Sequence, residues 1–326
     1  MKNKINLLLV FFTLLSISII SCTGVRKEIS VNYYKKLMPQ GFVQIGDTLF
    51  YDKTECRVLD WDEYMYWTRK VFGGNSEEYE ACKPDTLVWG NADNKCLHYY
   101  VDYYLRHPSF RNFPLVGISQ KQAEDYSKWK SDRVFEYMLI KLGKASLNPN
   151  QNRDSHFTID GYFNGTYHNQ KPDTAIHYYP EYRLPSLQEW QLAVKYMDSV
   201  DNLYYKKHSN KLRRNSNKSC TKYQCGIVPC MNDSLINYPT REVWLDSIPK
   251  RKEEIYHYRG HGHLGRKTIF NLRGNAREWT SEKSICVGGG WKDSKETVLR
   301  QDTIYVNYPD EQTGFRNVCI LKKWGK

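Results

Sequence analysis

The alternation of hydrophobic and polar residues predicts short strands mixed with a few amphipathic helices. Residues 41–51 (GFVQIGDTLFY) alternate between apolar and polar side chains, which predicts a strand. Asp60 and Glu63 form a D-x-x-E pattern at the start of an apolar stretch, so we expect a helix to begin near Trp61. Residues 113–118 (FPLVGI) are apolar and β-branched, as in a buried strand.

Two capping boxes predict the starts of two further helices. Ser119 and Gln122 open the first, whose buried face carries Ala123, Tyr126 and Trp129. Ser186 and Glu189 open the second, whose buried face carries Trp190, Val194 and Met197. Residues 256–320 are rich in glycine and short apolar runs, which predicts loops braced by a few strands.

The composition is that of an ordinary globular protein. The chain has 326 residues, of which 40% are hydrophobic and 26% charged, and this excludes wholesale disorder and a fibrous repeat. The net charge of +12 is spread along the chain, so it does not indicate nucleic-acid binding. Residues 206–235 form a basic, cysteine-containing insertion, which we interpret as a solvated surface segment. The alternative is a docking patch for an acidic partner or for lipid headgroups.

The N-terminus has the pattern of a secretory signal. Two lysines precede an apolar run at residues 5–20, which is short for a membrane-spanning helix. The run ends in Ile-Ile-Ser-Cys22, which resembles a bacterial lipobox. That resemblance implies a lipoprotein signal peptide at residues 1–21, an acylated Cys22 and a membrane lipid anchor. Residues 22–38 would then form a tether; the alternative is a plain signal peptide with a chance cysteine.

Eight cysteines remain besides Cys22. An even number of cysteines in an exported protein predicts disulfides, although the connectivity cannot be read from the sequence. Three of them are spaced by five residues, at Cys220, Cys225 and Cys230, which is not the spacing of a zinc knuckle. A loop closed by disulfides is the interpretation that we favour for this segment.

Four motifs in order resemble the formylglycine-generating-enzyme (sulfatase-modifying factor) domain family. They are residues 113–119 (FPLVGIS) with the helix that follows, 183–190 (RLPSLQEW), 271–280 (NLRGNAREWT), and 288–291 (GGGW) followed by 314–316 (GFR). The resemblance covers about residues 39–322. It implies a single α+β domain that is related to C-type lectins and has little regular secondary structure.

A narrower resemblance concerns the segments upstream. Residues 84–89 (PDTLVW) and 107–110 (HPSF) resemble the gliding-motility and type IX secretion lipoproteins of Bacteroidota. Those proteins carry this domain behind a lipobox, without known catalysis, and act as parts of envelope complexes. The segment between Trp89 and His107 departs from their pattern, so we carry over only the class of protein. The residues after Cys22 lack the acidic cluster that resembles a surface-export tag in this lineage. The resemblance therefore implies an exported lipoprotein on the periplasmic face of the outer membrane.

The resemblance also implies a test for catalysis. Enzymes of the family oxidise a substrate cysteine at a copper ion held by two thiolates, spaced Cys-x4-Cys just after the glycine motif. The matching segment, residues 292–298, has no cysteine. Cys286 lies before the glycines and Cys319 after residues 314–316, so we expect a disulfide or buried thiols rather than a rearranged copper site. We therefore expect no copper and no formylglycine-generating activity.

A calcium site is the other ligand set that the resemblance implies. In the family, the pattern Asn-x-x-Gly-Asn-x-x-Glu-Trp wraps a structural Ca²⁺, which prefers hard oxygen ligands. Carried over residue by residue, the ligands are the Asn271 side chain, the Gly274 and Ala276 carbonyls, and the Glu278 carboxylate. The alternative is a tight turn in which Asn275 and Glu278 bond the backbone while Trp279 enters the core.

A histidine group is a further metal candidate. His257, His261 and His263 follow an H-x3-H-x-H pattern, but the intervening glycines argue against a helix that would align them. A metal site in a loop is one interpretation. The other is exposed or hydrogen-bonded histidines without a metal.

Three functions are compatible with these observations. The first is a non-catalytic envelope lipoprotein that acts as a scaffold or binding component with protein partners. The second is a lectin-like module in which exposed aromatic side chains bind a glycan or a peptide. The third is an enzyme of another type on the same fold, because function depends on the site rather than on the fold.

Overall fold

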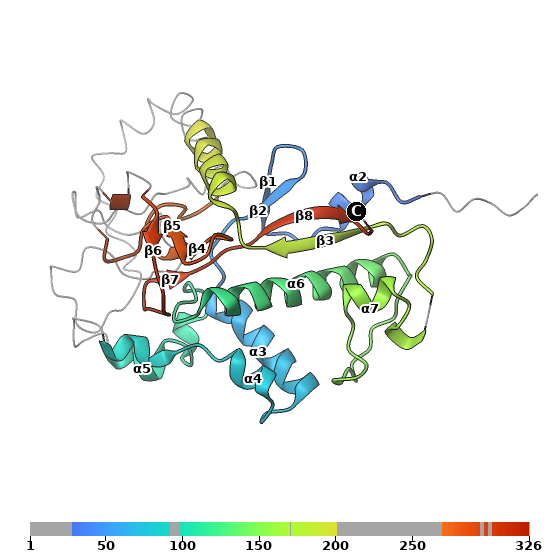
Figure 1. The fold of residues 1–326 in the computed structure, drawn as a ribbon, viewed down its shortest axis with the longest axis horizontal. Helices are drawn as coiled ribbons and strands as arrows, with labels where there is room; N and C mark the ends of the chain where they lie inside the picture. The colour runs from blue at the N-terminus through green and yellow to red at the C-terminus, as the bar shows by residue number, and fades with distance from the viewer. Residues whose placement is uncertain are drawn as a thin grey trace, which may run out of the picture.

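Two four-stranded sheets and the long helix α6 organise the part of the chain that the structure describes (Figure 1). The structure is a computed structural model and describes residues 28–91, 98–169, 171–200, 269–293, 297–298 and 302–325. The strands are β1 (Phe42–Ile45), β2 (Leu49–Asp52), β3 (Tyr178–Arg183), β4 (Arg277–Trp279), β5 (Ile285–Val287), β6 (Ile304–Tyr305), β7 (Thr313–Gly314) and β8 (Val318–Lys323). The helices are α2 (Val31–Leu37), α3 (Val58–Phe72), α4 (Glu77–Ala81), α5 (Tyr100–Tyr103), α6 (Gln120–Lys141) and α7 (Ile159–Phe163). Residues 187–200 are also helical, and the 3-10 turns are η1 (Thr86–Asn91), η3 (Pro108–Phe110) and η4 (Tyr167–Asn169).

The C-terminal strand β8 joins the two ends of the domain. In the first sheet, of order β1-β2-β8-β3, β8 lies antiparallel between β2 and β3. Cys319 of β8 is opposite Phe50 on one side and Tyr182 on the other. The second sheet has the order β6-β5-β4-β7, and its β4 and β7 are parallel. Strands from both halves of the chain are therefore needed to complete the fold, which the family resemblance predicted as α+β.

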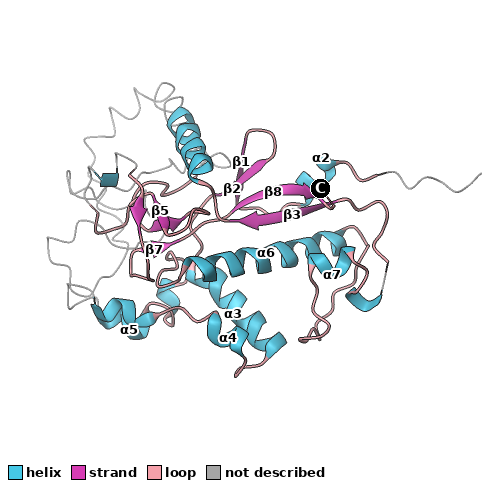
Figure 2. Ribbon diagram, viewed as in Figure 1, coloured by secondary structure: helices cyan, strands magenta, loops and turns pink. Residues whose placement is uncertain are grey.

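Helix α6 begins at the capping box that the sequence predicts. The Ser119 hydroxyl accepts a hydrogen bond from the Gln122 amide at 3.2 Å, and the Ser119 amide donates to Oε1 of Gln122 at 2.8 Å. Ala123 and Tyr126 are buried and Trp129 is half-buried, as the spacing indicates. Figure 2 shows α6 running along β3 and β8, with α3 and α4 on its far side.

The second capping box is confirmed as well. The Glu189 amide donates to Oγ of Ser186 at 3.2 Å, and the Ser186 amide donates to Oε2 of Glu189 at 2.9 Å. The helix that follows buries its predicted apolar face, which consists of Trp190, Val194 and Met197. These side chains pack against the hairpin of β1 and β2.

Three sequence predictions for the N-terminal part are corrected. Residues 41–51 form the hairpin of β1 and β2 rather than one strand, because Gly46, with φ of 67°, turns the chain between them. Helix α3 begins at Val58 rather than near Trp61, because Asp60 closes a capping box with Arg57. Part of the predicted tether is folded: residues 31–37 form α2, whose Tyr34 is completely buried.

Aromatic packing joins α3, α6 and the C-terminal segment. The Trp61 ring lies 5.4 Å from the Tyr126 ring, nearly parallel to it, and meets Phe315 edge-on at 6.1 Å. Nε1 of Trp61 donates to the carbonyl of Cys82 at 2.9 Å, so the ring is both packed and hydrogen-bonded. Within the described residues, no helix has both the length and the hydropathy needed to cross a membrane.

Candidate functional site

The loop of residues 271–276, which leads into β4, owes its shape to left-handed backbone conformations. Asn271, Gly274 and Asn275 have φ of 54°, 82° and 69°, which asparagine and glycine adopt more readily than other residues. The Gly274 amide donates to the carbonyl of Gly288 at 2.7 Å and holds the loop against the glycine turn. Both asparagine side chains are buried within the domain.

A buried group of charges lies beside this loop. Nε and Nη2 of Arg316 donate to Oε1 of Glu278 at 2.8 Å and 2.5 Å. Nη2 of Arg316 is also 3.7 Å from Oε2 of Glu55. The side-chain Nδ2 of Asn275 donates to Oε1 of Glu55 at 2.9 Å, and Nδ2 of Asn271 donates to Oε2 of Glu55 at 3.4 Å. The loop, the segment before α3 and the segment before β8 therefore meet at one polar site.

The charges of this site do not balance. Two carboxylates face one guanidinium, and all three side chains are removed from solvent. Burial raises the pKa of Glu278 to about 7, although Arg316 opposes the shift. Burial also opposes the charge of Arg316, but Glu278 and Glu55 outweigh it and raise the pKa of Arg316 further. The site would thus accommodate one more positive charge.

Two oxygen atoms of the site are buried without a hydrogen-bond partner. They are Oδ1 of Asn271 and Oε2 of Glu278, the two side chains in the calcium ligand set that the family resemblance implies. An unpartnered buried oxygen costs free energy, and a Ca²⁺ ion bound by both atoms would remove that cost. Both atoms are hard oxygen donors, so the chemistry of this donor set is compatible with a calcium ion. The described residues contain no group of three or more His, Cys, Asp or Glu side chains arranged for a metal, so such a site would depend on amide and carbonyl oxygens as well.

The alternative prediction, a simple tight turn at residues 271–279, agrees with only part of the structure. Trp279 enters the core, where its Nε1 donates to the carbonyl of Ile118 at 3.0 Å. Glu278, however, bonds Arg316 through Oε1 rather than the backbone. The carboxylate is thus part of the buried charge group and does not serve to close the turn.

Ion pairs occupy the start of the segment that follows the glycine motif. Arg277 binds Asp293 through Nε at 2.9 Å and Nη2 at 2.6 Å, and the Gly290 amide donates to Oδ2 of Asp293 at 2.6 Å. Lys292 pairs with Glu311. The two residues directly after the GGGW motif are therefore fixed by ionic contacts.

The described cysteines are isolated, buried thiols. Cys286 lies on β5 and Cys319 on β8, which belong to different sheets, and both thiols are free. Burial raises the pKa of both thiols well above the usual range, and that of Cys82 to about 11. Cys56 is also buried and free. The predicted disulfides are therefore wrong for these four cysteines, because each side chain is enclosed by core residues.

The sequence from residue 26 to residue 319 matches the model of the sulfatase-modifying factor enzyme 1-like domain family. The chain belongs to this family. No curated protein matches the sequence significantly. Among solved structures, the crystal structure of CarF is similar at a TM-score of 0.35 and 11% identity, covering 84% of this chain and 87% of that chain. A TM-score this low adds nothing to the family assignment.

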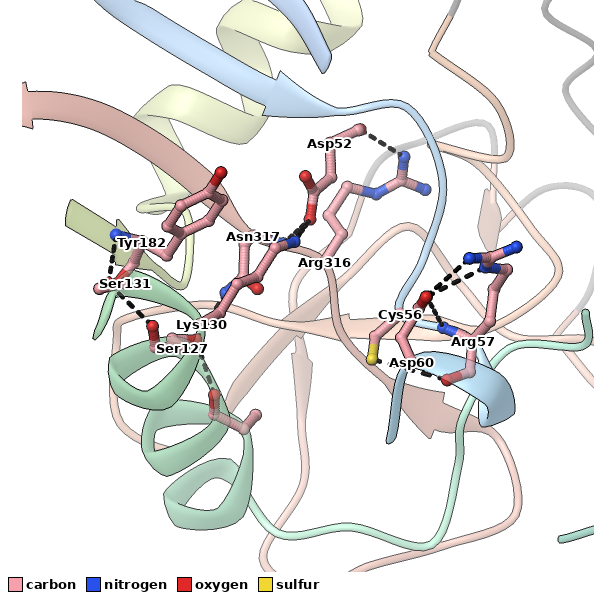
Figure 3. A network of polar contacts seen from close by, with 11 residues as sticks. Asp52, Cys56, Arg57, Asp60, Ser127, Lys130, Ser131, Tyr182, Arg316 and Asn317 are labelled. Carbon is pink, nitrogen blue, oxygen red and sulfur yellow. Dashed lines mark hydrogen bonds and ion pairs between the residues drawn. The ribbon is translucent and has the colours of Figure 1, made fainter. Parts of the chain in front are cut away.

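The sulfatase-modifying factor domain also contains a polar network that the sequence did not indicate (Figure 3). Oδ2 of Asp52 accepts hydrogen bonds from Nζ of Lys130 at 2.9 Å and from the Asn317 amide at 3.2 Å. The Asn317 side chain donates to Oγ of Ser127 at 2.5 Å. Nη1 of Arg316 donates to the Asp52 carbonyl at 3.3 Å, which connects this network to the buried charge group.

The importance of Glu55 was also missed. Glu55 lies between a predicted strand and a predicted helix, and no local sequence pattern indicates that it is buried. Arg316 was noted only as part of the GFR motif. Several predicted residues lie outside the described part of the chain: Cys22, His257, His261, His263, and the insertion at residues 206–235.

Proposed function

We propose that the chain is a lipid-anchored envelope lipoprotein whose sulfatase-modifying factor domain is catalytically inactive. The lipid anchor rests on the lipobox-like sequence that ends at Cys22, and the observation that carries the inactivity is the segment after the glycine motif. Where copper-dependent members need a Cys-x4-Cys pair, residues 292–298 of this chain contain no cysteine, and the first two of them, Lys292 and Asp293, are held in ion pairs. Soft thiolates are required to hold Cu(I), and residues 292–298 include none.

The buried thiols elsewhere support the same conclusion. A thiol must lose its proton to bind a metal, and burial keeps Cys286 and Cys319 protonated. Their positions on separate sheets also argue against a shared ion. The domain would then act as a scaffold or binding component of an envelope complex, on the periplasmic face of the outer membrane.

Calcium would serve this domain as a structural ion. Asn271 and Glu278 would hold it through the two unpartnered oxygens, together with the Gly274 and Ala276 carbonyls. Glu55 and Glu278 together face only one guanidinium, that of Arg316, and the ion would supply the further positive charge that balances them. Arg316 orients Glu278 by holding Oε1, which leaves Oε2 available.

A crosslinked pull-down from native membranes tests the scaffold role. We expect the full-length lipoprotein to recover envelope proteins in stoichiometric amounts, and the Cys22→Ser variant to recover fewer of them. Recovery of the wild-type protein alone would overturn the scaffold role. Mass spectrometry of the same material should find acyl chains on Cys22, and an unmodified Cys22 would overturn the anchor.

A peptide assay tests the proposed inactivity. A sulfatase-type peptide with the sequence Cys-x-Pro-x-Arg is incubated with the protein, copper and air. We expect no change in the mass of the peptide. A mass change in the cysteine, absent from the incubation without protein, would show that the domain is an active formylglycine-generating enzyme.

A ligand-binding role is the second candidate, and exposed tyrosines favour it. Tyr305 at the end of β6 is 67% exposed, and Tyr308, three residues further along the chain, is 80% exposed. Exposed aromatic rings can stack on sugars or on peptide side chains. Glycan-array binding that is lost in a Tyr305→Ser and Tyr308→Ser double variant would favour this function.

A further inference from the structure

A groove of about 310 Å³ lies beside the end of α6. Two lysines and two tyrosines contribute most of its polar chemistry: Lys144, Lys171, Tyr162 and Tyr167. Asp173 also lines it and pairs with Lys144 at 2.7 Å. The groove therefore has two ammonium groups and one carboxylate, an excess of one positive charge.

The backbone around the groove is well fixed. Gly143, with φ of 66°, ends α6, and the Lys144 amide donates to the carbonyl of Leu139 at 2.8 Å. On the opposite wall, the Asp173 amide donates to the hydroxyl of Tyr162 at 3.2 Å, and the Ala175 amide donates to Oδ1 of Asp173 at 2.9 Å. Lys144 and Asp173 thus extend from a preformed backbone.

The N-terminal segment enters the domain at this groove. Ile29 packs in the same apolar cluster as Ala145, Tyr162 and Tyr167, all of which line the groove. Its amide lies 3.4 Å from the carbonyl of Ala175 in a hydrogen bond. Six residues lie between Cys22 and Ile29, and the seven Cα-to-Cα steps that join them span at most about 25 Å when extended. An acyl chain on Cys22 would therefore hold the groove within the reach of lipid headgroups.

The surface near the groove has the composition of a membrane interface. Tyr33 of α2 and Tyr137 of α6 are about half exposed, and Lys141 lies over the Tyr137 ring at 5.2 Å. Lys323 lies 5.9 Å from the Tyr178 ring near the C-terminus. Tyrosine and lysine favour the boundary between lipid and water, because each has an apolar stem and a polar tip. Figure 1 shows α2, the end of α6, α7 and the C-terminus together at one end of the molecule.

We propose that this groove binds the phosphate of an anionic lipid headgroup in the leaflet that anchors the chain. Lys144 and Lys171 would donate to the phosphate oxygens, and the tyrosine rings would contact the glycerol backbone. The inference rests on the proposed lipid anchor, because the anchor brings the groove to the membrane. It adds a second contact, which would orient the domain on the leaflet.

Vesicle sedimentation tests the groove without the acyl chain. The protein begins at Thr23, which keeps every described residue and the whole of the family match. We expect binding to vesicles of phosphatidylglycerol mixed with phosphatidylcholine and none to pure phosphatidylcholine. Each lysine near a charged membrane contributes about five-fold in affinity, so Lys144→Gln with Lys171→Gln should weaken binding about 25-fold.

Matched variants distinguish binding at the groove from attraction by the overall positive charge of the protein. Lys121 lies about 30 Å along α6 from the end of the helix, and it pairs with Asp125 as Lys144 pairs with Asp173. Lys283 precedes Ser284, whose amide donates to Gln120 at the start of α6. The double change of these two lysines to Gln should alter binding less than two-fold. Asp173→Asn keeps an acceptor for the Ala175 amide and removes the carboxylate that competes with phosphate for Lys144. This change should strengthen vesicle binding about five-fold. Equal losses in the two lysine double variants, or unchanged binding in Lys144→Gln with Lys171→Gln, would overturn the proposal.

Two further readouts identify the source of failure. Saturable binding of inorganic phosphate that requires Lys144 and Lys171, without vesicle binding, would assign the groove to a soluble anion and overturn the lipid assignment. Acylation of Cys22 is measured separately by mass spectrometry. If Cys22 is acylated and the vesicles are not bound, this inference fails alone. If Cys22 is unmodified, the proposed anchor fails whatever the vesicles show.

Discussion

Removal of calcium is expected to lower the unfolding temperature of the domain. The reason is the unpartnered pair of buried oxygens, Oδ1 of Asn271 and Oε2 of Glu278, beside two carboxylates that share one guanidinium. Chelation would leave both oxygens unsatisfied and the excess negative charge uncompensated. The native state would lose stability, while the unfolded chain, whose ligands are dispersed, would be unaffected.

The size of the effect follows from linkage. Free calcium at about 100 times its dissociation constant stabilises the native state by about 2.7 kcal/mol. The matched domain spans residues 26–319, and an unfolding entropy of about 2.1 cal/mol/K per residue gives about 0.6 kcal/mol/K for a chain of that length. The expected shift is therefore about 4 °C. Differential scanning calorimetry in calcium and in excess chelator measures it directly.

Two asparagines provide a matched pair of variants. Asn271 and Asn275 are both buried, both have positive φ, and both donate to Glu55. Asn271→Gly removes the unpartnered oxygen without backbone strain and should abolish the calcium-dependent shift. Asn275→Gly should lower the unfolding temperature in both buffers and keep the shift. Equal unfolding temperatures of the wild-type protein in calcium and chelator, or a shift that persists in Asn271→Gly, would refute the calcium assignment.

Three further predictions concern stability and thiol reactivity. Burial raises the pKa of Asp132 to about 6 from an ordinary value of 3.8, so the stability that this group contributes below pH 4 is lost as the pH rises through 6. The loss is about 3 kcal/mol, and the Asp132→Asn variant should not show it in urea titrations across that range, because the asparagine side chain can still accept the hydrogen bond from the Ile159 amide. Trp61→Ala should cost about 3–5 kcal/mol in urea unfolding, because the ring fills the space against Tyr126 and its Nε1 bonds the Cys82 carbonyl. The four buried thiols should resist iodoacetamide at pH 8 in the native protein and react fully in denaturant, and rapid native alkylation of any one would contradict its burial.

Local patterns were sufficient for two of the helices. Ser119 with Gln122 and Ser186 with Glu189 specify helix starts through contacts over three residues, so the sequence alone determines them. The start of α3 was misplaced because Asp60 can act either as an N-cap or as the third residue of a capping box. Arg57, which binds both Asp60 oxygens, decides between these arrangements, and an arginine cap has no strong sequence signal.

Long-range contacts explain why other features were not predicted. Glu55 is 216 residues from Asn271, and its meeting with Arg316 depends on the insertion of β8 between β2 and β3. The network of Asp52, Lys130 and Asn317 likewise joins three distant segments. The family motifs could point to residues 271–278 as a candidate calcium loop because the proposed ligands lie within eight residues of one another. A buried residue that completes the site from far away has no comparable local signature.

The glycine motifs of this chain are explained by packing, which separates the retention of the fold from the retention of catalysis. A side chain at Gly314 would place its Cβ 2.2 Å from the Leu115 carbonyl, and one at Gly290 would come within 2.8 Å of Oε1 of Gln312. The Leu115 carbonyl belongs to the backbone and cannot move aside, so Gly314 needs glycine whatever the domain does, whereas Oε1 of Gln312 ends a flexible side chain that can give way. In the glycine motif itself, Gly288 and Gly289 have φ of 88° and 74°, which favour glycine. Glycine is not required at residues 292 and 293, whose side chains form ion pairs at the edge of the turn. A chain that lost the copper ligands would therefore keep the glycine motif, and the presence of that motif is evidence for the fold rather than for the reaction.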